Sequence, residues 1–325
     1  MRKISIPSLA ILGAALAAAC GGSSGALKDQ AREAMPSKDT VQTSAPGSAA
    51  PGVAPAGPQS DSAIGVASTW KDVTVGVAAT FNISTVFALG LVETITAQEP
   101  TKCDATSCTW GPGHSAFDHN NFQMVVTRNG ANFDYALLGE PLSKPGSGFI
   151  TILSGSATPS GTAHHGSGNF VVDFDAAAKL DHPGTDTGKM SVVYTNVGPA
   201  NIQVSFPGVK DHDQPGQVDN IVYKYQADGS GGGDLDVAVH NTTSDVRFTV
   251  HSRWKSDGQG RADVEDKFAF ANVPYDVTLS ECWGIAPFNT VYFSSNNAAA
   301  IGQQNGGTES SCAFTPASPS TQTAP

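Results

Sequence analysis

Alternating apolar and polar positions dominate the chain after residue 120. Ile202, Val204 and Phe206 alternate with polar residues, and the stretch 245–255 repeats this pattern. A period of two residues gives a strand one apolar face and one wet face. Similar segments, separated by Gly, Asp and Asn turns, occupy 122–128, 132–139, 148–158, 168–175, 189–196, 201–208, 220–228, 234–242, 245–255, 260–270, 276–284 and 289–295. They predict a mainly β fold, a curved antiparallel meander of about eleven strands that curls into a barrel or half-barrel.

One earlier segment has a different pattern. Residues 73–92 carry no charge, and no turn signal interrupts them before 98–103. Length alone would admit a transmembrane helix, but Asn82 and several Ser and Thr residues argue against one. A helix that is apolar on most sides is normally buried. We therefore expect one buried N-terminal helix over 74–97, ended by Pro100 and lying on the concave side of the sheet.

The N-terminus predicts export and lipid attachment. A short positive start and an apolar stretch, 4–19, end in three alanines directly before Cys20, which is the order of a secretory signal peptide. The cysteine resembles that of the lipobox of bacterial lipoproteins, although Leu16 lies four rather than three residues before it. This resemblance implies a signal peptide at 1–19, an acylated Cys20 and, because Gly21 is not aspartate, an outer-membrane location. Several acyl chains would hold the protein stably on the membrane. A plain signal peptide is the alternative.

Composition divides the rest of the chain. Residues 20–66 are rich in Ala, Gly, Ser and Pro, so we expect a lipid-anchored disordered linker. Residues 67–314 are expected to form a single β-rich domain, and the polar, Pro-rich tail 315–325 to be disordered. The formal net charge of −11 argues against nucleic acid as a partner. No cofactor is expected.

Four cysteines remain once Cys20 is set aside: Cys103, Cys108, Cys282 and Cys312. An even number in an exported protein predicts disulfides, with three possible connectivities. Local pairing, 103 with 108 and 282 with 312, needs the least loop closure. A zinc site would need a different cysteine spacing and neighbouring histidines.

Other polar groups are weaker candidates. The histidines at 164, 165 and 182 could bind a metal, and so could the mixed Asp and His loop 211–213 or the Gly/Asp turn 228–236, but exposed turns explain all three groups. Ser252, His251 and Asp263 form the best triad that can be drawn. Adjacent strand residues face opposite ways, so His251 and Ser252 could not hydrogen-bond as catalysis requires. Arg261 could form an exposed cross-strand ion pair with Asp263 or Glu281.

Three blocks of sequence carry a resemblance. They are "ALGLVETITAQEPT…TWGP" (88–112), "LLGEPLS…ILSGSATP" with "GSGNFVVDFDAA", and "HSRWKSDGQGRADV…SECWG…FNTVYF…ESSCAF". Together they resemble a group of uncharacterised lipoproteins of myxobacteria and related soil bacteria. The resemblance implies no activity, substrate or catalytic residue. It supports the pairing of Cys282 with Cys312, but it does not extend to Cys103 and Cys108.

These observations favour a cell-envelope protein without catalytic activity. Its role would be structural, or it would bind a small apolar ligand or another envelope protein. A curled antiparallel sheet can enclose a small apolar ligand, but no cavity remains if the helix packs permanently against the sheet. The alternative is an exported hydrolase that acts on envelope or prey material.

Overall fold

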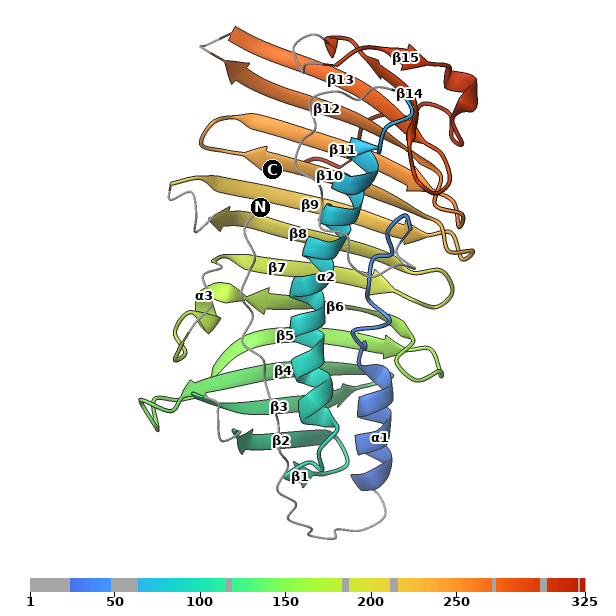
Figure 1. Cartoon of the computed structure of the whole chain (residues 1–325). Coiled ribbons are helices and arrows are strands. Elements are labelled where there is room, and N and C mark those ends of the chain that lie inside the picture. The colour runs from blue at the N-terminus through green and yellow to red at the C-terminus, as the bar shows by residue number, and fades with distance from the viewer. Residues whose placement is uncertain are drawn as a thin grey trace.

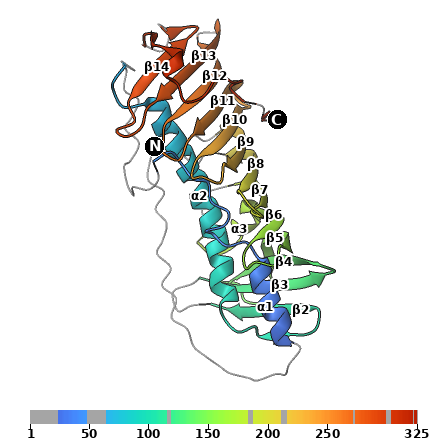
Figure 2. The ribbon, with the colours of Figure 1, turned by 90° about the vertical axis from the view of Figure 1, so that its right-hand side faces the viewer.

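The computed structural model describes residues 24–47, 64–114, 119–182, 187–210, 216–270, 273–298, 303–320 and 322–324. Fifteen antiparallel strands of this described chain form one sheet, in which each strand pairs with its neighbours in sequence. The long helix α2 crosses the strands along one face of the sheet, with the shorter helix α1 beside it (Figure 1). In the view turned by 90°, both helices lie on the same side of a strongly twisted sheet (Figure 2).

The helices are α1 (Ser24–Ala34), α2 (Thr69–Thr96), α3 (Phe174–Ala177) and the 3-10 turn η2 (Glu309–Ser311). The strands are β1 (Lys102–Cys103), β2 (Ser107–Gly113), β3 (Asn120–Asn129), β4 (Asn132–Pro141), β5 (Ile150–Pro159), β6 (Gly166–Asp173), β7 (Lys189–Thr195), β8 (Asn201–Lys210), β9 (Val218–Ala227), β10 (Gly233–Asn241), β11 (Val246–Trp254), β12 (Gly260–Phe270), β13 (Val273–Trp283), β14 (Thr290–Ser295) and β15 (Gly306–Gly307).

The predicted antiparallel meander is confirmed. Of the finer expectations, the count of about eleven strands is too low, and the barrel, given as one alternative beside a half-barrel, is not formed. The segments expected from 122 to 295 correspond to β3–β14, and the additional strands are β1, β2 and β15. The turn between β3 and β4 has two residues and begins at Gly130, whose φ of +64° suits a tight hairpin. β1 and β15 form the two edges, so the sheet is open rather than a barrel. Both edge strands are only two residues long, which limits pairing with other chains.

The predicted buried helix is present and begins five residues earlier than expected. Ser68 caps it by accepting a hydrogen bond from the Lys71 backbone N–H at 3.1 Å. One stripe of α2, with a spacing of three and four residues, faces the sheet and is buried: Thr74, Ala78, Phe81, Thr85, Leu89, Val92 and Thr96. Asn82 binds the backbone of Thr43 through both its amide oxygen and its amide nitrogen, which explains a polar residue in this uncharged run.

The N-terminal segment 24–47 differs from the expected disordered linker. Residues 24–34 form α1, and Leu27, Ala31 and Ala34 are buried against the sheet. Arg32 donates hydrogen bonds to the carbonyl groups of Thr96, Ala97 and Gln98 at the C-terminal end of α2. These groups lack partners within a helix, so α1 caps α2 as well as covering the sheet.

The C-terminal residues also differ from the expected disordered tail. The segment 309–320, here called the C-terminal strap, follows the outer face of the sheet, opposite the helices. Thr315, Ala317 and Ser318 use backbone atoms to contact side chains of β11 and β12.

The predicted signal peptide, 1–19, and Cys20 lie outside the described residues, as does part of the predicted linker. Within the described part of the chain, none of the helices has the length and apolar character needed to cross a membrane.

Candidate functional site

The apolar face of the sheet is occupied by the protein itself. The ring centroids of Phe81 on α2 and Tyr223 on β9 are 3.8 Å apart, and Leu89 is fully buried. Nearer the start of the helix, the hydroxyl oxygens of Thr74 and Ser252 lie 2.6 Å apart. These contacts place α2 where a ligand of a hollow half-barrel would lie. Two pockets, of about 260 and 160 Å³, lie at other places in the fold.

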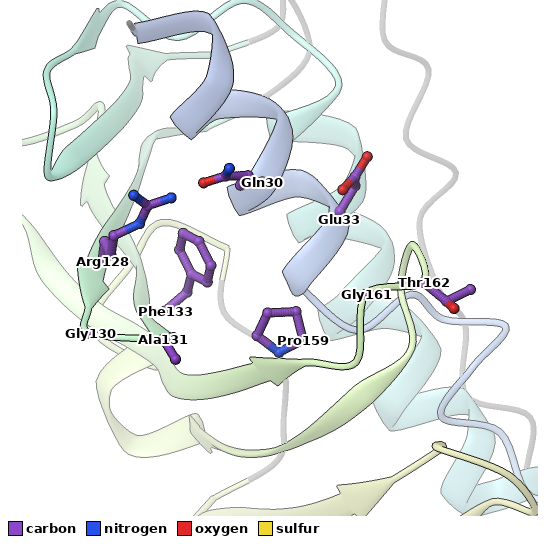
Figure 3. A pocket seen from close by; sticks show the side chains of 9 residues that line it. All are labelled: Gln30, Glu33, Arg128, Gly130, Ala131, Phe133, Pro159, Gly161 and Thr162. Atoms are coloured by element: carbon purple, nitrogen blue, oxygen red, sulfur yellow. The ribbon is translucent and has the colours of Figure 1, made fainter.

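The first pocket lies between α1 and the turns that join β3 to β4 and β5 to β6 (Figure 3). α1 is held there by the backbone: the N–H of His164 donates to the Glu33 carbonyl at 2.7 Å. The floor contains the nearly buried ring of Phe133, and Arg128 lies over that ring at 5.6 Å from its centroid. The pocket is lined by Gln30, Glu33, Arg128, Gly130, Ala131, Phe133, Pro159, Gly161 and Thr162.

The second pocket lies on the outer face of the sheet, where charges alternate across the strands. The pairing register places Lys224, Asp236, His251 and Asp263 in one row over β9–β12. The pocket is lined by Lys224, Gln226, Asp234, Asp236 and His251. His251 contacts Asp234 through Nε2 at 2.9 Å and the Ser318 carbonyl through Nδ1 at 3.2 Å. Burial lowers the pKa of His251, but the hydrogen bond and the charge of Asp234 raise it above its ordinary value overall.

Beside this pocket, an ion network is buried under the C-terminal strap. Arg261 is 1% exposed and contacts Asp263 at 2.8 Å, Ser280 at 2.9 Å and Glu309 at 3.1 Å. Arg253 contacts Asp263 Oδ2 at 2.9 Å, an oxygen that Arg261 Nε also contacts, at 3.0 Å. The expected exposed ion pair of Arg261 is therefore a buried pair with Asp263, because the strap covers it.

Glu281 lies on the opposite face of the sheet, at the start of α2. It is fully buried and accepts hydrogen bonds from the Trp70 N–H, at 2.8 Å, and from the Thr290 hydroxyl. A helix N-terminus has free N–H groups and favours a negative charge. Burial nevertheless raises the pKa of Glu281 above its ordinary value, although the hydrogen bonds from Thr290 and Trp70 lower it. Glu281 fastens the first turn of α2 to the sheet.

This geometry predicts how Glu281 affects stability across pH. Its folded-state pKa lies above the ordinary value of 4.5, so its contribution to stability is complete below pH 4.5 and is lost as the pH rises through the folded-state pKa. Glu281→Gln should therefore gain stability relative to the native chain as the pH rises. Glu281→Ala should lose about 1–3 kcal/mol, because the Trp70 N–H loses its acceptor. Urea unfolding from pH 4 to 8 measures both.

The control is Glu265→Gln, which removes a partly exposed carboxylate from the neighbouring strand β12. We expect it to leave the pH dependence due to Glu281 in place. Parallel stability curves for Glu281→Gln and the native chain would contradict the assignment.

The structure also shows where the candidate cysteines and the candidate triad lie. Cys103 pairs with Cys108 and Cys282 with Cys312, as expected. His251 faces outward whereas Ser252 contacts α2, so the two cannot form a triad.

The three histidines considered as metal ligands have separate contacts. His164 and His165 contact the carbonyls of Met35 and Asn196, and the His182 ring lies 3.9 Å from that of His119. In the turn at 228–232, the Asp228 carboxylate accepts backbone hydrogen bonds from Ser230 and Gly232.

The loop 211–213 lies outside the described residues. Across the ranges that the structure describes, no group of three or more His, Cys, Asp or Glu side chains could hold a metal ion.

Known protein families, curated proteins and solved structures contain no match to this chain. A function must therefore be argued from the geometry of the chain itself.

Sequence reasoning missed the role of Glu281, although a signal was present. Leu279 and Trp283 are in phase on the buried face of β13, so the residue between them faces the core as well. A carboxylate at a strand position whose neighbours two residues away are apolar and buried indicates a buried polar contact. Arg128 carries no comparable signal, because its pocket depends on the position of α1.

Proposed function

We propose that this protein is a lipid-anchored protein of the cell envelope, attached to the outer membrane through Cys20, with a structural or protein-binding role. The charged start, the apolar stretch 4–19 and the alanines before Cys20 support the anchor. Part of the same proposal is that the chain is related to the myxobacterial lipoproteins that it resembles. Two disulfide pairs fit an oxidising compartment.

The packing of α2 is the observation that carries the choice of role. A carrier of apolar ligands needs an open apolar space, whereas here the stripe from Thr74 to Thr96 and the side chains of the sheet fill that space. Carriage would require the helix to leave, and Glu281 at its start and Arg32 at its end both hold it in place. The outer face of the sheet carries Lys224, Asp234 and His251 beside the C-terminal strap, and we assign this surface to an envelope protein as partner.

Native mass spectrometry of the full-length protein, extracted in a mild detergent, tests both parts. We expect a mature chain that begins at Cys20, carries the mass of covalent acyl chains and holds no additional lipid. Cys20→Ser should abolish the acyl mass and leave the protein out of the membrane fraction. A chain that begins elsewhere without acyl mass would refute the anchor. A lipid bound non-covalently to the protein would refute the structural role, because it would have to displace α2 from the sheet.

A further inference from the structure

The pocket beside α1 has polar side chains with no protein partners. Gln30 and Glu33 project from α1, Arg128 from the end of β3 and Thr162 from the turn after β5 (Figure 3). None of these four side chains has a hydrogen bond or an ion pair with another residue that the structure describes, apart from the contact of Arg128 with the Phe133 ring. The polar groups of Arg128 and Gln30, which lie nearest each other in the pocket, are therefore available to a ligand (Figure 3).

Arg128 differs from the other arginines. Of the five arginines in the described ranges, Arg32, Arg247, Arg253 and Arg261 each have a carboxylate within 4.0 Å, and Arg128 does not. The chain has 29 acidic and 18 basic residues, so carboxylates are in excess. An unpaired guanidinium beside a pocket is therefore unusual in this protein.

The surroundings of Arg128 suit one kind of anion. The Phe133 ring holds the guanidinium from one side, which limits its orientations. Gln30 extends from α1 toward Arg128, whereas the Glu33 carboxylate points away from it (Figure 3). Ala131 and Pro159 give the pocket an apolar wall. A planar guanidinium binds a carboxylate through two parallel hydrogen bonds, and the Gln30 amide can donate a third.

We propose that this pocket binds a small carboxylate with an apolar, flat body. The carboxylate binds Arg128 and Gln30, and the body lies against Ala131 and Pro159. The volume of about 260 Å³ is below the about 300–1,000 Å³ of pockets for drug-sized ligands, so the ligand is of the size of benzoate.

Titration of the full chain with benzoate, followed by NMR, tests this assignment. We expect saturable shifts at Gly130 and Gly161, and binding of the neutral analogue benzamide at least about tenfold weaker. Arg128→Gln should weaken benzoate binding by about tenfold or more, and Gln30→Ala by about two- to tenfold. Added salt should weaken it as well, because the site is open to solvent.

Arg247→Gln is the matched control. Arg247 is an exposed arginine on β11, far along the sheet from β3, and it pairs with Asp245. Its loss should leave benzoate binding unchanged, and thermal melts should show that all variants fold. Equal affinities for benzoate and benzamide, or an Arg128→Gln variant that binds benzoate as the native chain does, would overturn the proposal.

Discussion

Replacing Asp263 with alanine should lower the free energy of unfolding by about 3–5 kcal/mol, the cost of removing one partner from a buried ion pair. Asp263 is 2% exposed and accepts hydrogen bonds from Arg261, Arg253 and Ser280. Without it, Glu309 supplies the one carboxylate among the described residues that still pairs with the buried Arg261, and Glu309 is half exposed. The Ala317 N–H of the C-terminal strap also loses its acceptor. Urea unfolding followed by tryptophan fluorescence measures the loss.

Two variants show whether the loss comes from an uncompensated buried charge. The double variant Arg261→Met with Asp263→Leu should recover most of the stability, because an apolar pair can replace a buried ion pair with little loss. Asp245→Asn removes an exposed carboxylate beside Arg247 and His240 and should change stability little, because exposed ion pairs contribute little and asparagine tolerates the positive φ of +52° at this position. If Asp263→Ala costs no more than Asp245→Asn, the network does not stabilise the fold.

The strands could be predicted because their signals are local. The segments between 122 and 295 alternate in polarity and end at Gly, Asp or Asn, and these features depend on neighbouring residues only. β1 and β15 are too short for any alternation, and β2 contains Gly111 and Pro112, which usually indicate a turn. Closure of the sheet depends on which edges meet, and no local pattern encodes that.

Helix α1 was missed because its apolar stripe is made of small residues. Leu27, Ala31 and Ala34 have helical spacing, but the two alanines bury little area, so composition alone resembles that of a linker. The stability of α1 comes from tertiary contacts. Lys28 pairs with Glu99 at 3.0 Å, and Arg32 binds the end of α2. Both contacts join residues more than sixty positions apart, which no local pattern shows.

The ion network could be predicted in part. Arg261 and Asp263 share a face by alternation, whereas Glu281 pairs in register with Ala262 and so points to the other face. Sequence alone does not give this register. It also does not show that the C-terminal strap covers Arg261, because burial there comes from a segment nearly fifty residues later.

Removing the disulfide between Cys282 and Cys312 should lower the free energy of unfolding by about 3–4 kcal/mol. The bond closes a loop with a sequence separation of 30, and without it the unfolded chain gains the conformational entropy of that loop. For a domain of this size, the melting temperature should fall by about 7–15 °C. The bond also joins β13 to the strap, so Cys282→Ser with Cys312→Ser should speed hydrogen exchange in the strap and on β12 more than in α1. Calorimetry and exchange mass spectrometry measure these effects.

The second disulfide supplies the matched control. Cys103 and Cys108 have a sequence separation of 5, so Cys103→Ser with Cys108→Ser should cost only about 2 kcal/mol. Its effect on exchange should stay near β1 and β2, at the other edge of the sheet. A larger loss from this pair than from Cys282 and Cys312, or strap exchange that is unchanged in the Cys282 variant, would show that the strap is held by its ionic contacts alone.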